Sequence, residues 1–259
     1  MSSEKGYCPH TTRVASMSPP PTARSLMDYV LYDYWEENQD KTASHLPLVG
    51  GGPWKILGIV GLYLLAIVIG KRMMRNRPPY SCQKAMIWYN LFNVIANLGG
   101  FVAAFLGTNF GLDVWGCKKK YFPSHLLYLG YGYLLLKFVD FLDTLFFILR
   151  KKDNQITFLH VTHHCLMPIT CYVGLKFVPY GNTGFTPLIN SFVHVVMYFY
   201  YYLAALGPQY QNYLWWKQYI TGRFQRIYFC FKPIISFHSV SSTQFPLNFH
   251  SISIQLVCV

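Results

Sequence analysis

The sequence is poor in charge. Only 12% of its 259 residues are Asp, Glu, Lys or Arg, about half of the 25% that is usual in soluble domains, and no acidic residue follows Asp153. It holds no Asn-x-Ser/Thr sequon and no Cys-x-x-Cys pair, which excludes a zinc-finger spacing of its cysteines. Residues 1–24 lack the apolar core of a signal peptide. With 53% hydrophobic residues, the composition excludes a disordered chain and disfavours a water-facing globule.

The charges that are present are mostly positive: 22 Lys and Arg stand against 10 Asp and Glu, for a formal net charge of +12. An excess of this size is also typical of nucleic-acid-binding proteins. Here the cations form short clusters at the ends of apolar runs, where membrane proteins keep their cytoplasmic anchors. The partner we expect is therefore a lipid bilayer and not a nucleic acid.

Apolar runs long enough to cross a bilayer recur along the chain. They predict an all-α multipass bundle with five clear spans, at 54–70, 86–106, 125–149, 156–177 and 185–206. A sixth apolar segment, 227–236, is short and is interrupted by Lys232-Pro233. Counting spans places 71–85, 150–155 and 207–226 on one side, and their cations mark that side as cytoplasmic; Lys118–Lys120 falls on the other side, against the rule.

The expected organisation has four parts. A Ser/Pro-rich disordered tail (1–24) precedes a lumenal interfacial segment with a short helix (25–53), the membrane domain (54–221) and an atypical C-terminal segment (222–259).

The third span contains charges that a bilayer disfavours, at about 2.5–3.5 kcal/mol each. Lys137, Asp140 and Asp143 are spaced i, i+3, i+6 and share a helical arc of roughly 120°. One interpretation is a structural ion pair between Lys137 and Asp140 that joins two helices. The other is a polar wall that faces a cavity filled with water or substrate.

The fourth span begins with three histidines on one helical face, His160, His163 and His164. A single imidazole in a span is often only a hydrogen-bonding group between helices. Three together favour chemistry, either metal ligation by neutral imidazole or acyl transfer, in which imidazole is the nucleophile and general base.

The fifth span carries a further stripe. Asn190, His194, Met197, Tyr198 and Tyr201 share an arc of roughly 100°. An interfacial belt explains the tyrosines but not an Asn and a His inside the run. Three successive spans with one polar stripe each predict that the stripes face one another across one cavity.

In order and spacing, these stripes resemble the motifs of the ELO family of very-long-chain fatty acid elongases. The matching segments are Lys137-x-x-Asp140-x-x-Asp143-Thr144, His160-x-x-His163-His164 and Asn190-x-x-x-His194-x-x-Met197-Tyr198-x-Tyr200-Tyr201. Asp140 replaces the Glu that is usual in the first motif. The resemblance runs from about Trp54 to Thr221.

The resemblance implies an endoplasmic reticulum enzyme with seven spans, six of them in a barrel around an acyl tunnel. It implies condensation of a long acyl-CoA with malonyl-CoA to a 3-ketoacyl-CoA, with release of CO₂ and CoA. No metal or other cofactor is expected; the expected partners are the two CoA substrates, a second copy of the chain and other enzymes of the elongation cycle. The family's covalent chemistry falls on His163 and His194.

The chemistry of the residues supports the same assignment. An acyl-imidazole is reactive, and the remaining imidazoles and Asn190 can polarise a thioester carbonyl or bind an enolate oxygen. A carboxylate can fix a histidine tautomer, and cations at the cytoplasmic end suit CoA phosphates. The expected catalytic residues are His160, His163, His164, Asn190 and His194; the supporting ones Lys137, Asp140, Asp143, Tyr198 and Tyr201; the CoA-binding ones Arg150, Lys151 and Lys152.

The C-terminal segment departs from the family pattern as we compare it, because Gln225 lies one place late and 237–259 shows no helical periodicity. We therefore expect a truncated barrel that lacks a wall, with weak or absent activity. The alternatives are an inactive or regulatory membrane isoform and a His-box membrane desaturase or hydroxylase, although the histidines outside the motifs form no further box. The preferred acyl chain length does not follow from the sequence.

Overall fold

A computed structural model describes residues 28–112, 124–177, 179 and 184–210. The described residues form helices and no strand, as the apolar pattern predicted. The elements are η1 (Tyr29–Asp33), α2 (Tyr34–Glu37), α3 (Trp54–Met74), α4 (Gln83–Gly107), α5 (Ser124–Val139), α6 (Phe141–Leu149), η3 (Asp153–Gln155), α7 (Phe158–Phe177) and α8 (Phe185–Leu206).

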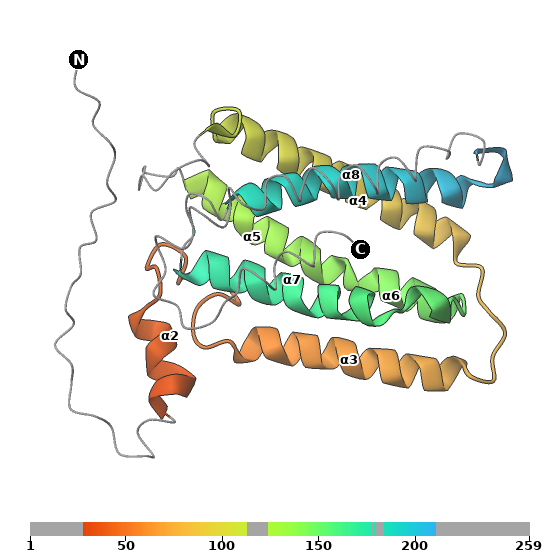
Figure 1. The fold of residues 1–259 in the computed structure, drawn as a ribbon, viewed down its shortest axis with the longest axis horizontal. Coiled ribbons are helices and arrows are strands. Elements are labelled where there is room, and N and C mark those ends of the chain that lie inside the picture. Colours follow the sequence, from red (N-terminus) through yellow and green to blue (C-terminus); the bar gives the residue numbers. More distant parts are fainter. Residues whose placement is uncertain (1–27, 113–123, 178, 180–183, 211–259) are drawn as a thin grey trace.

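The long helices lie side by side in a bundle (Figure 1). Helix α4 packs along α8 and also touches α5, while α7 packs against α5 and α3, and α3 packs against α6. The helix pair α5 and α6 therefore lies in the middle of the described bundle, between α4 and α8 on one side and α3 and α7 on the other.

Three helices are long and apolar enough to cross a membrane: α3, α4 and residues 186–206 of α8. At 1.5 Å per residue, the 21 residues of α3 span about 30 Å, the thickness of a hydrocarbon core. Large apolar side chains such as Leu62, Val68 and Trp88 are exposed on these helices, where lipid can cover them. The chain is thus an all-α, multipass membrane protein. Helices α5 and α6, with 16 and 9 residues, are each too short to cross a bilayer alone.

The third span is not the single helix that we expected over 125–149. Helix α5 ends at Val139 and α6 begins at Phe141, with Asp140 between them. The Asp143 N–H bonds to the Asp140 carbonyl at 3.1 Å, three residues back, which is the tighter 3₁₀ pattern. Side chains at i and i+3 eclipse in such a turn, so the two aspartates lie one above the other.

The cationic segments meet at one end of the bundle. Lys151 Nζ donates to the Arg75 carbonyl at 3.2 Å, Lys71 pairs with Asp153 at 3.4 Å, and the Tyr80 N–H donates to the Leu149 carbonyl at 2.9 Å. These contacts hold the end of α3, the start of α4 and the end of α6 together. The span count put the same segments on one side; Lys118–Lys120 lies outside the described residues.

The opposite end is covered by the chain between α2 and α3. Ala43, Leu46 and Val49 pack against Leu127, Leu134 and Leu175 of α5 and α7. Lys176, which is 0% exposed, donates to the Gln39 side chain at 3.0 Å and to the carbonyls of Val49 and Gly51 at 3.1 and 2.6 Å. This lysine, which the sequence analysis did not single out, fixes the N-terminal segment to α7.

Lys176→Met is expected to lower the free energy of unfolding by at least about 1–3 kcal/mol, because it leaves buried carbonyl oxygens without their donor. Thermal unfolding in detergent measures the loss. Lys55→Met is the matched control, since Lys55 is exposed and reaches the neighbouring Gly50 carbonyl only at 3.5 Å. Equal melting temperatures for the two variants would contradict a structural role for Lys176.

Candidate functional site

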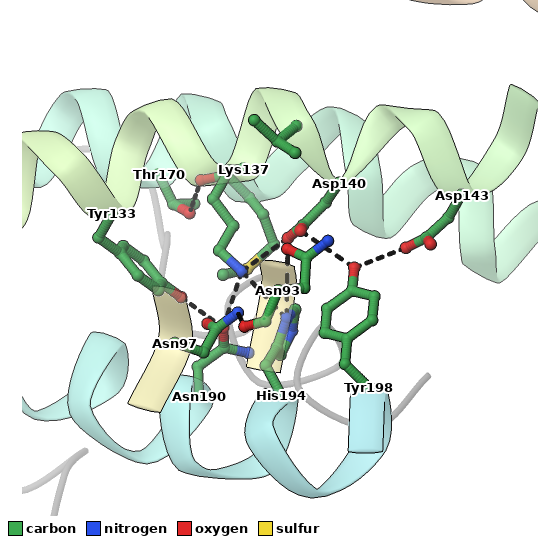
Figure 2. Close-up of polar contacts among 12 residues, drawn as sticks. Asn93, Asn97, Tyr133, Lys137, Asp140, Asp143, Thr170, Asn190, His194 and Tyr198 are labelled. Carbon is green, nitrogen blue, oxygen red and sulfur yellow. Dashed lines mark hydrogen bonds and ion pairs between the residues drawn. The ribbon is translucent and has the colours of Figure 1, made fainter. Parts of the chain in front are cut away.

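A buried ion pair lies at the centre of the polar groups. Lys137 Nζ and Asp140 Oδ2 are 2.9 Å apart, and both residues are only 2% exposed. Lys137 also donates to Asn190 Oδ1 at 3.1 Å and lies 3.5 Å from His194 Nδ1. The pair therefore joins α5 to α8, and the polar stripes of these two helices face each other as predicted (Figure 2).

Asn190 is held in one orientation. Its Oδ1 accepts hydrogen bonds from Lys137 and from the Tyr133 hydroxyl, the latter at 2.5 Å. Because both partners are donors, the oxygen of the amide must be the end that faces them. The amide nitrogen is left as the end that can donate to a bound group.

One hydroxyl joins the two aspartates. Tyr198, fully buried, places its Oη 3.0 Å from Asp140 Oδ1 and 2.7 Å from Asp143 Oδ2. Both contacts arise because the tight turn at Asp140 stacks the carboxylates. The Tyr89 hydroxyl of α4 lies 3.4 Å from the Tyr198 hydroxyl oxygen.

The histidines of α7 form a buried group beside α6. His160 Nε2 lies 2.8 Å from Thr144 Oγ1, which in turn lies 2.8 Å from the Tyr63 hydroxyl of α3. The His160 and His164 rings are 4.3 Å apart, and the His163 and His164 rings 5.4 Å. All three imidazoles are buried together, as their spacing predicted.

His163 and His164 both lie within electrostatic range of the buried ion pair, since each interacts with Lys137 and Asp140. His163 also interacts electrostatically with His194. The two histidines expected to carry the covalent chemistry thus lie within electrostatic range of each other and are both buried, on opposite sides of the α5–α6 pair.

The predicted shared cavity stays a prediction. Two cavities of the described part, of about 290 and 150 Å³, lie elsewhere and have apolar linings. Residues of the polar stripes line neither; the first lies between α4 and α8, against Phe101, Phe105 and Phe192. Within the described ranges, no group of three His, Cys, Asp or Glu side chains has the arrangement of a metal site.

A fourth polar stripe was missed in the sequence. Asn90, Asn93 and Asn97 follow a helical spacing along α4 and are all buried. Asn93 and Asn97 donate to the carbonyls four residues back, at 3.1 and 2.9 Å, which leaves both Oδ1 atoms without a partner. Figure 2 shows them beside Lys137 and Asn190. The same periodicity test that found the other stripes would have found this one.

The expected CoA-binding cations lie at the end of α6, and two of them have partners in the chain. Arg150 donates to the Met86 sulfur at 3.3 Å, and Lys151 to the Arg75 carbonyl. Lys152 is exposed. Tyr201 touches Tyr198 edge to face, with ring centroids 6.2 Å apart, and is 37% exposed, at the margin of the site.

The comparisons with known proteins agree with this arrangement of motifs. The profile of the ELO family, described as the GNS1/SUR4 family, matches residues 49–258. The chain belongs to the ELO family. It is 40% identical over 197 residues to very long chain fatty acid elongase 7 of Rattus norvegicus, in an alignment that covers 74% of this chain and 70% of the relative.

Other relatives are similar to a like degree. Very long chain fatty acid elongase 4 of Homo sapiens is 39% identical over 203 residues, which cover 76% of this chain and 64% of the relative. Very long chain fatty acid elongase 7 of Drosophila melanogaster is 34% identical over 237 residues, 86% of this chain and 71% of the relative. The chain therefore spans about two thirds of the length of these ELO relatives.

The family match corrects one expectation. It continues to residue 258, so the prediction that the resemblance ends at Thr221 is wrong. The expected loss of the sixth span concerns residues 211–259, which lie outside the described residues.

Proposed function

We propose that this ELO protein condenses a long-chain acyl-CoA with malonyl-CoA in the endoplasmic reticulum membrane, giving 3-ketoacyl-CoA, CO₂ and CoA. The observation that carries the proposal is the buried cluster in which Lys137 and Asp140 of one span contact Asn190 and His194 of another. Ionisable groups inside a membrane mark functional sites by default. The relatives named as very long chain fatty acid elongases supply the substrate class.

The proposed chemistry uses imidazole as the acyl carrier. An imidazole nitrogen attacks the thioester carbonyl and displaces the CoA sulfur, and the acyl-imidazole then accepts the carbon nucleophile that malonyl-CoA leaves when it loses CO₂. His163 and His194 are the two candidates for this step. The Asn190 amide nitrogen and the imidazoles of His160 and His164 are the donors or acceptors proposed for the carbonyl and enolate oxygens.

The burial of the cluster supports this chemistry. Charge that develops on an oxygen in a water-excluded site gains more from fixed donors than it would in water. Lys137 is fixed by contacts to Asp140 and Asn190, so it needs no rearrangement when the charge appears. The same exclusion of water protects an acyl-imidazole from hydrolysis.

The test is a reconstituted assay. The purified chain in lipid vesicles is given a long-chain acyl-CoA and radiolabelled malonyl-CoA, and labelled 3-ketoacyl-CoA and released CO₂ are measured together. Condensation predicts both products in equal amounts. A chain that inserts normally but forms neither product would contradict the proposal and favour an inactive or regulatory isoform.

The alternatives have no specific observation in their favour. The isoform hypothesis rested on residues 222–259, and the family match now runs through most of that segment. A desaturase or hydroxylase would add oxygen chemistry to the acyl chain without malonyl-CoA, so the assay above separates it from condensation. The expected association with a second copy and with other enzymes of the cycle remains a proposal.

Lys152 is an exposed cation among those proposed to meet the CoA phosphates. Lys152→Gln is expected to raise KM for acyl-CoA several-fold at low salt and to leave kcat nearly unchanged, because the contact acts on binding and is screened by ions. Lys55→Gln at the opposite end of the bundle is the control. An unchanged KM in Lys152→Gln would assign the phosphates to other residues.

A further inference from the structure

The contacts of Tyr198 with the two aspartates cannot both be full hydrogen bonds if both carboxylates are ionised. A tyrosine hydroxyl has one hydrogen to donate, and an ionised carboxylate only accepts. Yet Tyr198 Oη lies within 3.0 Å of an oxygen of Asp140 and within 2.7 Å of an oxygen of Asp143. Both contacts become full hydrogen bonds when one of the two carboxyl groups holds a proton and donates it to Tyr198.

The proton belongs on Asp143. Asp140 has the Lys137 ammonium at 2.9 Å, which stabilises its ionised form, whereas no ion pair joins Asp143 to a cation among the residues that the structure describes. Two carboxylates this close also disfavour double ionisation. The hydrogen bonds then run in one direction, from Asp143 to Tyr198 and from Tyr198 to Asp140.

The chain of contacts continues to the site. Asp140 Oδ2 contacts Lys137 Nζ, and Lys137 Nζ lies 3.5 Å from His194 Nδ1. At its other end, Asp143 is only partly buried and lies on α6, two turns from the cationic end of the bundle. The groups form a line from Asp143 to the imidazole of His194, which Figure 2 shows.

We propose that Asp143 and Tyr198 relay one proton per turnover to His194. This inference rests on the proposed condensation. When the acyl group replaces the hydrogen on a ring nitrogen, that hydrogen leaves with the CoA sulfur as the thiol. When the enolate left by CO₂ loss forms the carbon–carbon bond, the acyl–nitrogen bond breaks and its electron pair stays on the ring.

The ring must then regain a proton, and the relay supplies it. Lys137 gives a proton to His194 and becomes a neutral amine. Asp140 takes the hydrogen of Tyr198 on Oδ1 while Tyr198 takes that of Asp143. The protonated Asp140 carboxyl group then rotates and gives its proton to the Lys137 amine. Water at the cationic end restores Asp143. One proton is consumed for each CO₂ released, which balances the overall reaction.

The test uses two substitutions that keep size and shape, Asp143→Asn and Tyr198→Phe. We expect each to lower kcat by about 10²-fold, the lower range for loss of a proton-transfer group, with little change in KM for either substrate. The first release of CoA, which precedes the proton demand, should stay near the wild-type rate in single-turnover experiments. Tyr202→Phe, one turn further along α8, is the matched control.

Two measurements separate a relay from a merely structural role. Formate, a small carboxylic acid, should restore part of the activity of Asp143→Ala. Infrared spectra should show the carbonyl band of a protonated carboxylic acid in the wild type and its loss in Asp143→Asn, whether or not the protein is active.

Each result decides between distinct claims. Wild-type kcat in Asp143→Asn or Tyr198→Phe would overturn the relay while leaving the condensation intact. Absence of labelled product from the wild type would overturn the proposed condensation, and the relay to His194 with it; the infrared band would then report only where the proton sits.

Discussion

Replacing His194 or His163 with alanine is expected to lower the rate of condensation by on the order of 10³-fold or more, because each imidazole is a candidate for the covalent step. The loss should fall on kcat, since neither ring lies among the cations expected to hold CoA. Steady-state incorporation of radiolabelled malonyl-CoA measures it, together with the amount of protein inserted in the membrane.

The two variants also tell the roles apart. The imidazole that carries the acyl group is the one whose loss removes the labelled acyl-protein intermediate as well as the product. His45→Ala is the control, because His45 is exposed and contacts only Tyr128, at 3.4 Å, among the contacts found for it. Activity of His163→Ala and His194→Ala close to that of His45→Ala would remove the imidazoles from the mechanism.

Lys137→Met is expected to destabilise the protein by about 3–5 kcal/mol, the cost of removing one partner from a buried ion pair. Asp140 would remain at 2% exposure, with only the Tyr198 hydroxyl and the His194 imidazole, 3.7 Å away, beside it. Asn190 would lose one of its two donors. Thermal unfolding in detergent and the yield of folded protein measure the effect.

The double variant Lys137→Met with Asp140→Asn should regain most of this stability, because no unpaired charge is left, and should still be inactive. That combination would show that the pair is kept for the reaction and not for the fold. If Lys137→Met alone were as stable as the wild type, the ion pair would not be sealed from water. If the double variant had normal activity, Lys137 and Asp140 would form a structural ion pair without a role in the reaction.

Much of the membrane architecture followed from the sequence. Apolar length and the cationic segments between runs placed the helices of the five expected spans to within a few residues, and three of these helices are long and apolar enough to cross a membrane. A helix in lipid must satisfy its own backbone, and its length is set by the bilayer. The order and spacing of the motifs also indicated the ELO family, which the profile match confirmed.

The sequence predicted on which helical face each residue of the candidate site lies, but not which residues it contacts. Periodicity correctly grouped His160, His163 and His164, and it put Asn190, His194 and Tyr198 on one side of α8. It did not predict the partners Tyr133, Tyr63 and Tyr89, because a tyrosine in an apolar run resembles any interfacial aromatic.

Tertiary structure alone decided which polar groups meet. A helical repeat fixes the angle of a side chain about its own axis, but the rotation and height of one helix against another depend on packing between helices, which in lipid is driven by close van der Waals contact and interhelical hydrogen bonds. That packing brings Asn190 into hydrogen-bonding distance of Lys137, Thr144 of His160, and Lys176 of the chain ahead of α3. The tight turn at Asp140, which sets both aspartates against Tyr198, is likewise absent from the repeat of the sequence, because a 3₁₀ turn and an α-helical turn accept the same residues. The sequence by itself determined the spans and their polar faces. The packing of α5 and α6 against α8 decided which groups on those faces form hydrogen bonds with one another.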